Sequence, residues 1–139
     1  MNNEWIMEYL KNYPKQRFWQ YLQNNPEQSK IILNIDYSDL NDIIEKLKLL
    51  HQQEKNSQDK LELSLEEQII LTLIFLTQYL DLHYLSLLFD VGESTVKGIC
   101  SYWEFIFQIN PSIWYKIIRA KRGKKLPFAR EIPIISIQG

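Results

Sequence analysis

Cysteine, glycine and proline are scarce in this chain of 139 residues, which contains one, four and five of them. The single thiol, Cys100, cannot form an internal disulfide, which indicates a reducing compartment. The longest apolar run, residues 69–76, is interrupted by Thr72 and is far too short to cross a bilayer. The polar N-terminus shows no signal-peptide pattern. These absences predict a cytoplasmic protein with no membrane contact.

Helix-forming residues are abundant. Leu, Ile, Lys, Glu and Gln dominate the composition, and most of them favour helix. Apolar residues make up 45% of the chain, which is enough for one core of ordinary size. We therefore predict an all-α fold built as a multi-helix bundle.

Charge is distributed unevenly along the chain, although the net charge is only −1. Residues 1–115 hold nine basic and sixteen acidic side chains, whereas residues 116–139 hold seven basic and one acidic. Six of the basic residues fall in one stretch: Lys116, Arg119, Lys121, Arg122, Lys124 and Lys125. Such a stretch suits contact with nucleic acid or another polyanion. It equally suits a solvated helix end followed by a loose tail, where cations favour the helix dipole.

The chain divides into four predicted segments. Residues 1–54 form an N-terminal helical segment, whose clearest part is an amphipathic helix over 37–54. The fully polar stretch 52–61 predicts a linker. Residues 62–115 form a helix-turn-helix domain, and residues 116–139 form a basic, β-branched tail. Aromatic residues of the N-terminal segment are expected to pack in the core rather than stack on bases.

A capping box opens the second half of the chain. The Ser64 hydroxyl is expected to accept a hydrogen bond from the Glu67 amide, while the Glu67 side chain reaches back. The helix that follows, residues 65–79, is apolar on nearly every side. A helix of this kind is buried all round, so we expect it to be the central pillar of the fold.

Residues 82–99 fit a helix-turn-helix pattern. Asp81 can cap the first helix, and residues 90–92 form the turn. The second helix opens after Gly92 and runs through Trp103. Two short helices that cross steeply need apolar inner contacts, here supplied by Leu85, Phe89, Val91, Val96 and Ile99. Asn110 and Pro111 start a further helix, which runs to about Ala120.

This region resembles the N-terminal helix-turn-helix domain of DDE-type insertion-sequence transposases, in the form found in cyanobacteria. Residues 85–96 read LSLLFDVGESTV, close to the family's L-x-x-L-F-G-V-S-E-S-T-V, and Trp103 closes the pattern. The resemblance extends over residues 22–113, about two thirds of the chain. It implies that the helix beginning at Glu93 enters the major groove of double-stranded DNA. The residues expected to face bases or phosphates are Glu93, Ser94, Thr95, Lys97 and Ser101.

Three positions depart from the family pattern. Asp90 stands at the turn glycine, and Gly92 stands at the capping serine. Gly98 follows Lys97 where many relatives carry a basic residue. A glycine inside a helix costs about 1 kcal/mol relative to alanine. Each change weakens the expectation of tight, sequence-specific binding.

The catalytic part of such transposases is missing from this sequence. DDE chemistry needs three carboxylates around two divalent metals, and after residue 104 only Glu131 carries one. We expect no enzyme activity, cofactor, metal site or small-molecule substrate. The apolar end of the tail, residues 126–137, contains two prolines and many β-branched residues. A short edge strand, an extended arm to a partner, or disorder all fit it.

Two functions remain open from the sequence. The first is a non-catalytic regulator, derived from a transposase, that binds transposon ends or a promoter and competes with the intact enzyme. The second is a protein-interaction or dimerisation module that no longer binds DNA specifically. The expected protein partners are a second copy or an intact transposase.

Overall fold

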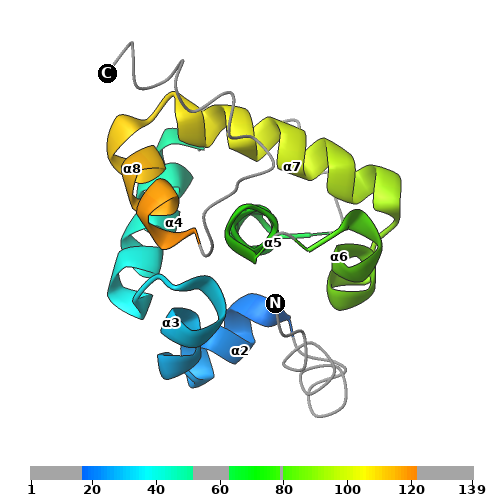
Figure 1. The fold of residues 1–139 in the computed structure, drawn as a ribbon, viewed down its shortest axis with the longest axis horizontal. Coiled ribbons are helices and arrows are strands. Elements are labelled where there is room, and N and C mark those ends of the chain that lie inside the picture. The colour runs from blue at the N-terminus through cyan, green and yellow to red at the C-terminus, as the bar shows by residue number, and fades with distance from the viewer. Residues whose placement is uncertain (1–16, 52–62, 79, 122–139) are drawn as a thin grey trace.

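Helices account for all the regular structure in the described residues of the computed structural model, which are 17–51, 63–78 and 80–121 (Figure 1). In chain order they are α2 (Phe18–Asn24), α3 (Glu27–Leu33), α4 (Tyr37–His51), α5 (Leu65–Gln78), α6 (Leu82–Phe89), α7 (Glu93–Gln108) and α8 (Pro111–Ala120). This confirms the all-α prediction. The predicted linker 52–61 and the apolar end of the tail lie outside the described residues.

The helix α5 lies at the centre of the molecule, where Figure 1 shows it end-on with the other helices around it. It packs against each of the other six helices of the described chain. Ile69, Ile70 and Ile74 are fully buried, and Thr72 lies buried among them. The Thr72 hydroxyl donates to the Gln68 carbonyl oxygen at 2.9 Å, so this polar group is satisfied inside the helix. The predicted central pillar is therefore confirmed.

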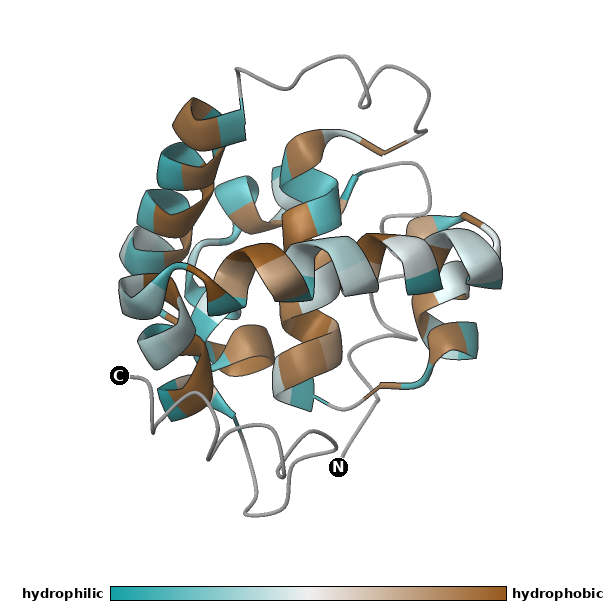
Figure 2. Cartoon of the chain, turned by 90° about the horizontal axis from the view of Figure 1, so that it is seen from above, coloured by the Kyte–Doolittle hydropathy of each residue, from teal (hydrophilic) through white to brown (hydrophobic). Residues whose placement is uncertain are grey.

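One continuous core joins the N-terminal helices to the rest. Phe18 and Leu22 of α2 belong to the same buried cluster as Leu40 of α4 and Trp103 of α7. Figure 2 shows the apolar residues gathered on the inner sides of the helices and polar residues on the outer sides. The segments before and after the predicted linker thus share a single interior.

Of the two hydrogen bonds predicted for the capping box, the structure shows one. The Ser64 hydroxyl accepts from the Glu67 amide at 3.2 Å, as expected. The Glu67 side chain does not return to Ser64, however, and instead accepts from the backbone amides of Phe18 (3.1 Å) and Trp19 (2.6 Å). Arg17, the N-cap of α2, makes no side-chain cap. Because the first amides of a helix have no partner within it, Glu67 of α5 supplies the acceptors that α2 lacks.

The predicted helix-turn-helix residues form α6 and α7, joined by the turn Asp90–Gly92. The Asp81 carboxylate accepts from the Tyr84 amide at 2.9 Å and caps α6 as predicted. Asp90 adopts the left-handed conformation (φ 58°), and the Val91 amide donates to the Ser86 carbonyl oxygen at 3.1 Å. Of the five predicted inner contacts, Leu85, Phe89, Val96 and Ile99 are buried and Val91 is half-buried. Figure 1 shows α6 lying across the N-terminal end of α7.

Candidate nucleic-acid interface

The inner face of α7 fixes which residues it presents outward. Val96, Cys100, Trp103 and Phe107 are all buried on this face. The Trp103 indole N–H donates to the Gln68 side-chain oxygen at 2.9 Å, which ties α7 to the central helix. An aromatic ring held by both packing and a hydrogen bond leaves α7 little freedom to rotate. The opposite face of the helix is therefore turned consistently to solvent.

The outer face of α7 brings three of the predicted contact residues together. Ser94, Lys97 and Ser101 are all exposed and follow one another at intervals of three and four residues, which places them in one stripe. Gly98 lies in the same stripe, and a Cβ atom built there would meet nothing within 4 Å. We call Ser94, Lys97, Gly98 and Ser101 the outer stripe.

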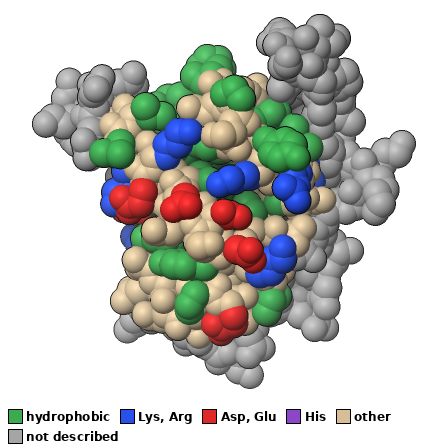
Figure 3. Space-filling model, turned by 90° about the vertical axis from the view of Figure 1, so that its left-hand side faces the viewer, with side chains coloured by type: hydrophobic (Ala, Val, Ile, Leu, Met, Phe, Trp, Pro, Cys, Tyr) green, Lys and Arg blue, Asp and Glu red, His purple; other side chains and the backbone are tan. Residues whose placement is uncertain are grey.

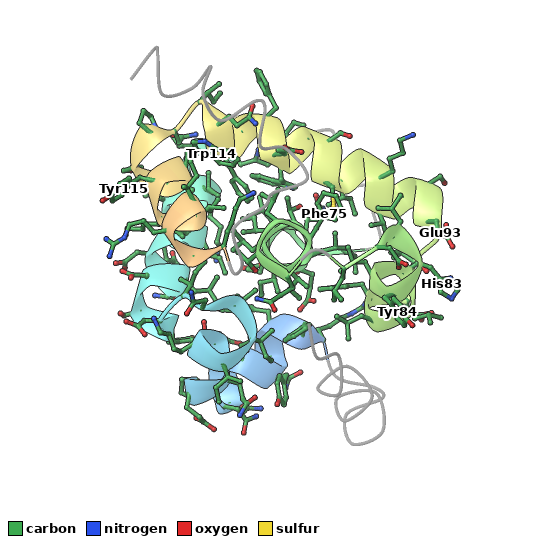
Figure 4. All side chains as sticks on the ribbon, in the orientation of Figure 1. Phe75, His83, Tyr84, Glu93, Trp114 and Tyr115 are labelled. Carbon is green, nitrogen blue, oxygen red and sulfur yellow. The ribbon has the colours of Figure 1, made fainter. Side chains whose placement is uncertain are left out.

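The other two predicted contact residues are placed differently. Thr95 is half-buried at the side of α7. Glu93 is exposed, but its carboxylate lies 3.1 Å from Nδ1 of His83 on α6. Figure 4 shows His83 and Glu93 side by side where the two helices meet. The N-terminal end of α7 thus carries a carboxylate beside the backbone amides that would favour an anion.

The described residues of the basic stretch do not join this face. Lys116 and Arg119 lie on α8, whose start follows the C-terminal end of α7, far from Glu93 in Figure 4. Lys116 pairs with Asp39 of α4 at 3.5 Å, and Arg119 lies over the Tyr115 ring, 5.5 Å from its centre. Lys121 is only 8% exposed and lies over the Trp114 ring at 5.8 Å.

The domain boundary predicted after residue 115 falls inside a helix, because α8 continues to Ala120. Lys116 and Arg119 are therefore helical residues packed beside the body of the protein rather than parts of a tail. Arg122, Lys124 and Lys125 lie outside the described residues. Figure 3 looks onto the side of the molecule that carries α8 and shows acidic and basic side chains interspersed there, so this face is not a patch of one sign.

A groove that the sequence analysis missed lies at the other end of α7. It is formed by the last turn of α4 and the C-terminal half of α7, and includes Leu50, His51, Tyr102, Ile106 and Ile109. The signal was present in the sequence, since Tyr102, Ile106 and Ile109 recur at helical spacing at the C-terminal end of α7. Their exposure could be recognised only after the buried face of α7 was known.

Neither a metal site nor a membrane span is found in the described residues. Within them, no three His, Cys, Asp or Glu side chains are grouped as metal ligands. Among the same residues, no helix has both the length and the apolar character needed to cross a bilayer. Comparison with protein-family models, curated proteins and solved structures found no match to this chain.

Proposed function

We propose that this chain binds duplex DNA without catalysing a reaction on it, with α6 and α7 acting as a helix-turn-helix. The observation that carries the proposal is the outer stripe of α7. It presents two hydroxyls and one ammonium group at the N-terminal half of a helix whose opposite face is locked into the core. Serine hydroxyls suit phosphate or base edges, and lysine suits phosphate or guanine.

The turn before α7 also supports this assignment. Asp90 stands where the resembling transposase pattern has glycine, and it adopts the left-handed conformation that glycine favours. The proposed ancestry from the N-terminal part of a transposase rests on this sequence resemblance.

The charges of α7 favour weak binding. The only cation of the outer stripe is Lys97, and Glu93 brings an opposing charge to the end of the helix. Few phosphate contacts mean a small number of released counterions, and therefore a shallow dependence of affinity on salt. A steep dependence on salt would instead assign binding to the basic residues after Lys121.

Fluorescence anisotropy of labelled duplexes tests the proposal. We compare the full chain with Lys97→Gln and with Lys46→Gln, a matched removal of an exposed charge on α4. In Lys97→Gln only, loss of one phosphate contact should reduce the slope of log affinity against log salt concentration by about one. An equal effect of both substitutions would remove α7 from the interface, and no binding by any of the three proteins at low salt would overturn the function itself.

The second candidate, a protein-interaction module, has its own supporting observation. Exposed apolar side chains lie on the C-terminal half of α7 and the end of α4, including Leu50 (53% exposed), Phe105 (59%) and Ile109 (57%). Leu50 and Ile109 line the same groove, and exposed apolar side chains that gather at one place are typical of interaction sites. The two candidates use different ends of α7 and are therefore compatible.

A further inference from the structure

His83 of α6 lies against the N-terminal end of α7, next to the outer stripe. Its Nδ1 atom is 3.1 Å from a carboxylate oxygen of Glu93, and both side chains are more than half exposed. The two residues can be followed in Figure 4 on the outer side of the junction between α6 and α7. Glu93 precedes Lys97 by four residues, so one turn of helix separates this pair from the cation of the outer stripe. A DNA backbone in contact with Lys97 would therefore pass close to the imidazole.

The contact with Glu93 determines which ring nitrogen of His83 carries a proton. An ionised carboxylate can only accept a hydrogen bond, so Nδ1 must be the donor. In the neutral imidazole the second nitrogen, Nε2, then has a lone pair and no proton, and it offers nothing to a phosphate oxygen, which is also an acceptor. In the imidazolium both nitrogens are donors. Protonated His83 can thus donate from Nε2 to phosphate while Nδ1 keeps its bond to Glu93.

The helices α5 and α7, which pack against α6, bring one charged group to His83. This group is Glu93, since Lys97 follows one turn later on α7 and forms no ion pair among the described residues. The charged residues of α5 are Glu66 and Glu67, which bind a lysine of α4 and two amides of α2. The charge of the imidazole is therefore coupled to Glu93.

The residues around His83 on its own helix leave Nε2 available. The ring of Tyr84 lies 6.0 Å from the imidazole, measured between centroids. Asp81 is engaged in capping α6, and Asp90 lies exposed at the turn after it. Helix α2, which stacks one ring on α6, has no charged residue. Within the described residues, Nε2 makes no hydrogen bond, so it is free to meet a ligand.

We propose that His83 contacts a DNA phosphate in its protonated form and that its protonation strengthens binding, an inference that rests on the proposed function. With neutral His83, the charges of Lys97 and Glu93 cancel on this face. With protonated His83, the three charges sum to plus one, and Nε2 carries the proton that a phosphate oxygen accepts. Histidine is the residue type whose charge ordinarily changes between about pH 5 and 8. This face should therefore attract duplex DNA more strongly at the acidic end of that range.

Fluorescence anisotropy of a labelled duplex, at about pH 5.5 and about pH 8, tests the proposal. The affinity of the full chain should rise about tenfold at the lower pH, which corresponds to one charge-assisted hydrogen bond. The slope of log affinity against log salt concentration should steepen by about one. His83→Gln should remove this response. Lys97→Gln is the matched control on the same face, and it should bind more weakly at both pH values and keep the response.

Nitrogen NMR of the imidazoles without DNA provides a second readout. The chain has two histidines, and the ring signals that disappear in His83→Gln belong to His83. At about pH 8 we expect the proton on Nδ1, and this preference should be lost in Glu93→Ala because the acceptor is removed. A proton on Nε2 in the natural protein would overturn the proposal, since the neutral ring could then already donate to phosphate.

Failure of this proposal can be distinguished from failure of the proposed function. Duplex binding with the same pH response in the natural protein and in His83→Gln would overturn the role of His83 and leave DNA binding in place. Binding that does not change between the two pH values would do the same. Absence of binding by all three proteins at both pH values would overturn DNA binding and, with it, the role of His83.

Discussion

Glu67 is a carboxylate buried between two helices that are distant in sequence. It is 2% exposed and accepts hydrogen bonds from two amides of α2, at 3.1 Å and 2.6 Å. These bonds favour the ionised form, as does the charge of Arg17, but burial outweighs them and raises the pKa of the Glu67 carboxyl above its ordinary value of 4.5. The residue therefore both joins α2 to α5 and responds to pH.

Removing this cap should destabilise the protein. Glu67→Ala leaves two amides at the start of α2 without an acceptor, and the loss of partners for buried donors costs about 1–3 kcal/mol. The free energy of unfolding in urea measures this. Glu45→Ala is the control, because Glu45 forms a surface ion pair with Lys48. This substitution should lower the free energy of unfolding by less than about 0.5 kcal/mol. Equal losses in the two variants would exclude a capping role.

The raised pKa has a definite sign in a stability profile. Since folded Glu67 holds its proton more tightly than the unfolded chain does, its contribution to stability is complete below pH 4.5. The contribution is then lost as the pH rises from 4.5 through the raised pKa. The difference in unfolding free energy between the natural protein and Glu67→Gln should fall across this window. A flat difference would contradict the assignment.

Cys100 is expected to be chemically inert in the folded protein. The thiol is buried on the inner face of α7, and burial raises its pKa to about 12, against the opposing effect of a hydrogen bond with Thr72. Since the thiolate is the reactive form, a disulfide reagent at mildly alkaline pH should modify the unfolded chain rapidly and the folded chain only slowly. Rapid modification without denaturant would show that the inner face of α7 opens.

At the scale of elements, the turn between α6 and α7 shows what sequence could and could not predict. Spacing alone placed the helices, the Asp81 cap and the turn. The family pattern marked Asp90 as a departure, and the structure puts it in the left-handed conformation that favours glycine. The predicted side-chain partner of Glu67 was wrong, because a contact between residues 49 positions apart leaves no local signal.

Glycine at the two left-handed positions should have different consequences. Asp90→Gly relieves the backbone conformation at φ 58° and should stabilise the protein by about 0.5–1 kcal/mol. Asn34→Gly relieves φ 61° but removes the side-chain bond from Asn34 to the Ala120 carbonyl oxygen at 3.0 Å, which contributes about 1 kcal/mol. In thermal unfolding, Asp90→Gly should therefore have a higher melting temperature than Asn34→Gly. The reverse order would count against strain at the turn.

At the scale of the whole molecule, periodicity predicted the helices and the central place of α5, but not how far the core extends. Ile117 and Ala120, which follow the predicted domain boundary, are buried, and α2 shares their interior. The candidate site was predictable in part. The family resemblance named Ser94, Lys97 and Ser101, and their helical spacing puts them in one stripe. The separation of Lys116 and Arg119 from that stripe depends on three-dimensional packing, which the sequence does not reveal.

Truncation tests the extent of this core. A chain that stops at Tyr115 lacks the buried side chains of Ile117 and Ala120 and the hydrogen bond from Asn34 to the Ala120 carbonyl oxygen. Its free energy of unfolding should therefore be lower by at least about 2–5 kcal/mol, and it should unfold at a lower temperature. A chain that stops at Gly123 keeps all of these contacts, and its melting temperature should be close to that of the full protein. Circular dichroism on heating distinguishes the two. Equal melting temperatures would mean that α8 is dispensable.

The bond between Trp103 and Gln68 has a practical consequence. Because the inner face of α7 is anchored by its buried residues and by this bond, the positions of the outer stripe can be varied as a set without removing that anchor. Libraries randomised at Ser94, Lys97, Gly98 and Ser101, with Trp103 and Gln68 kept, would present new exposed surfaces on one constant scaffold.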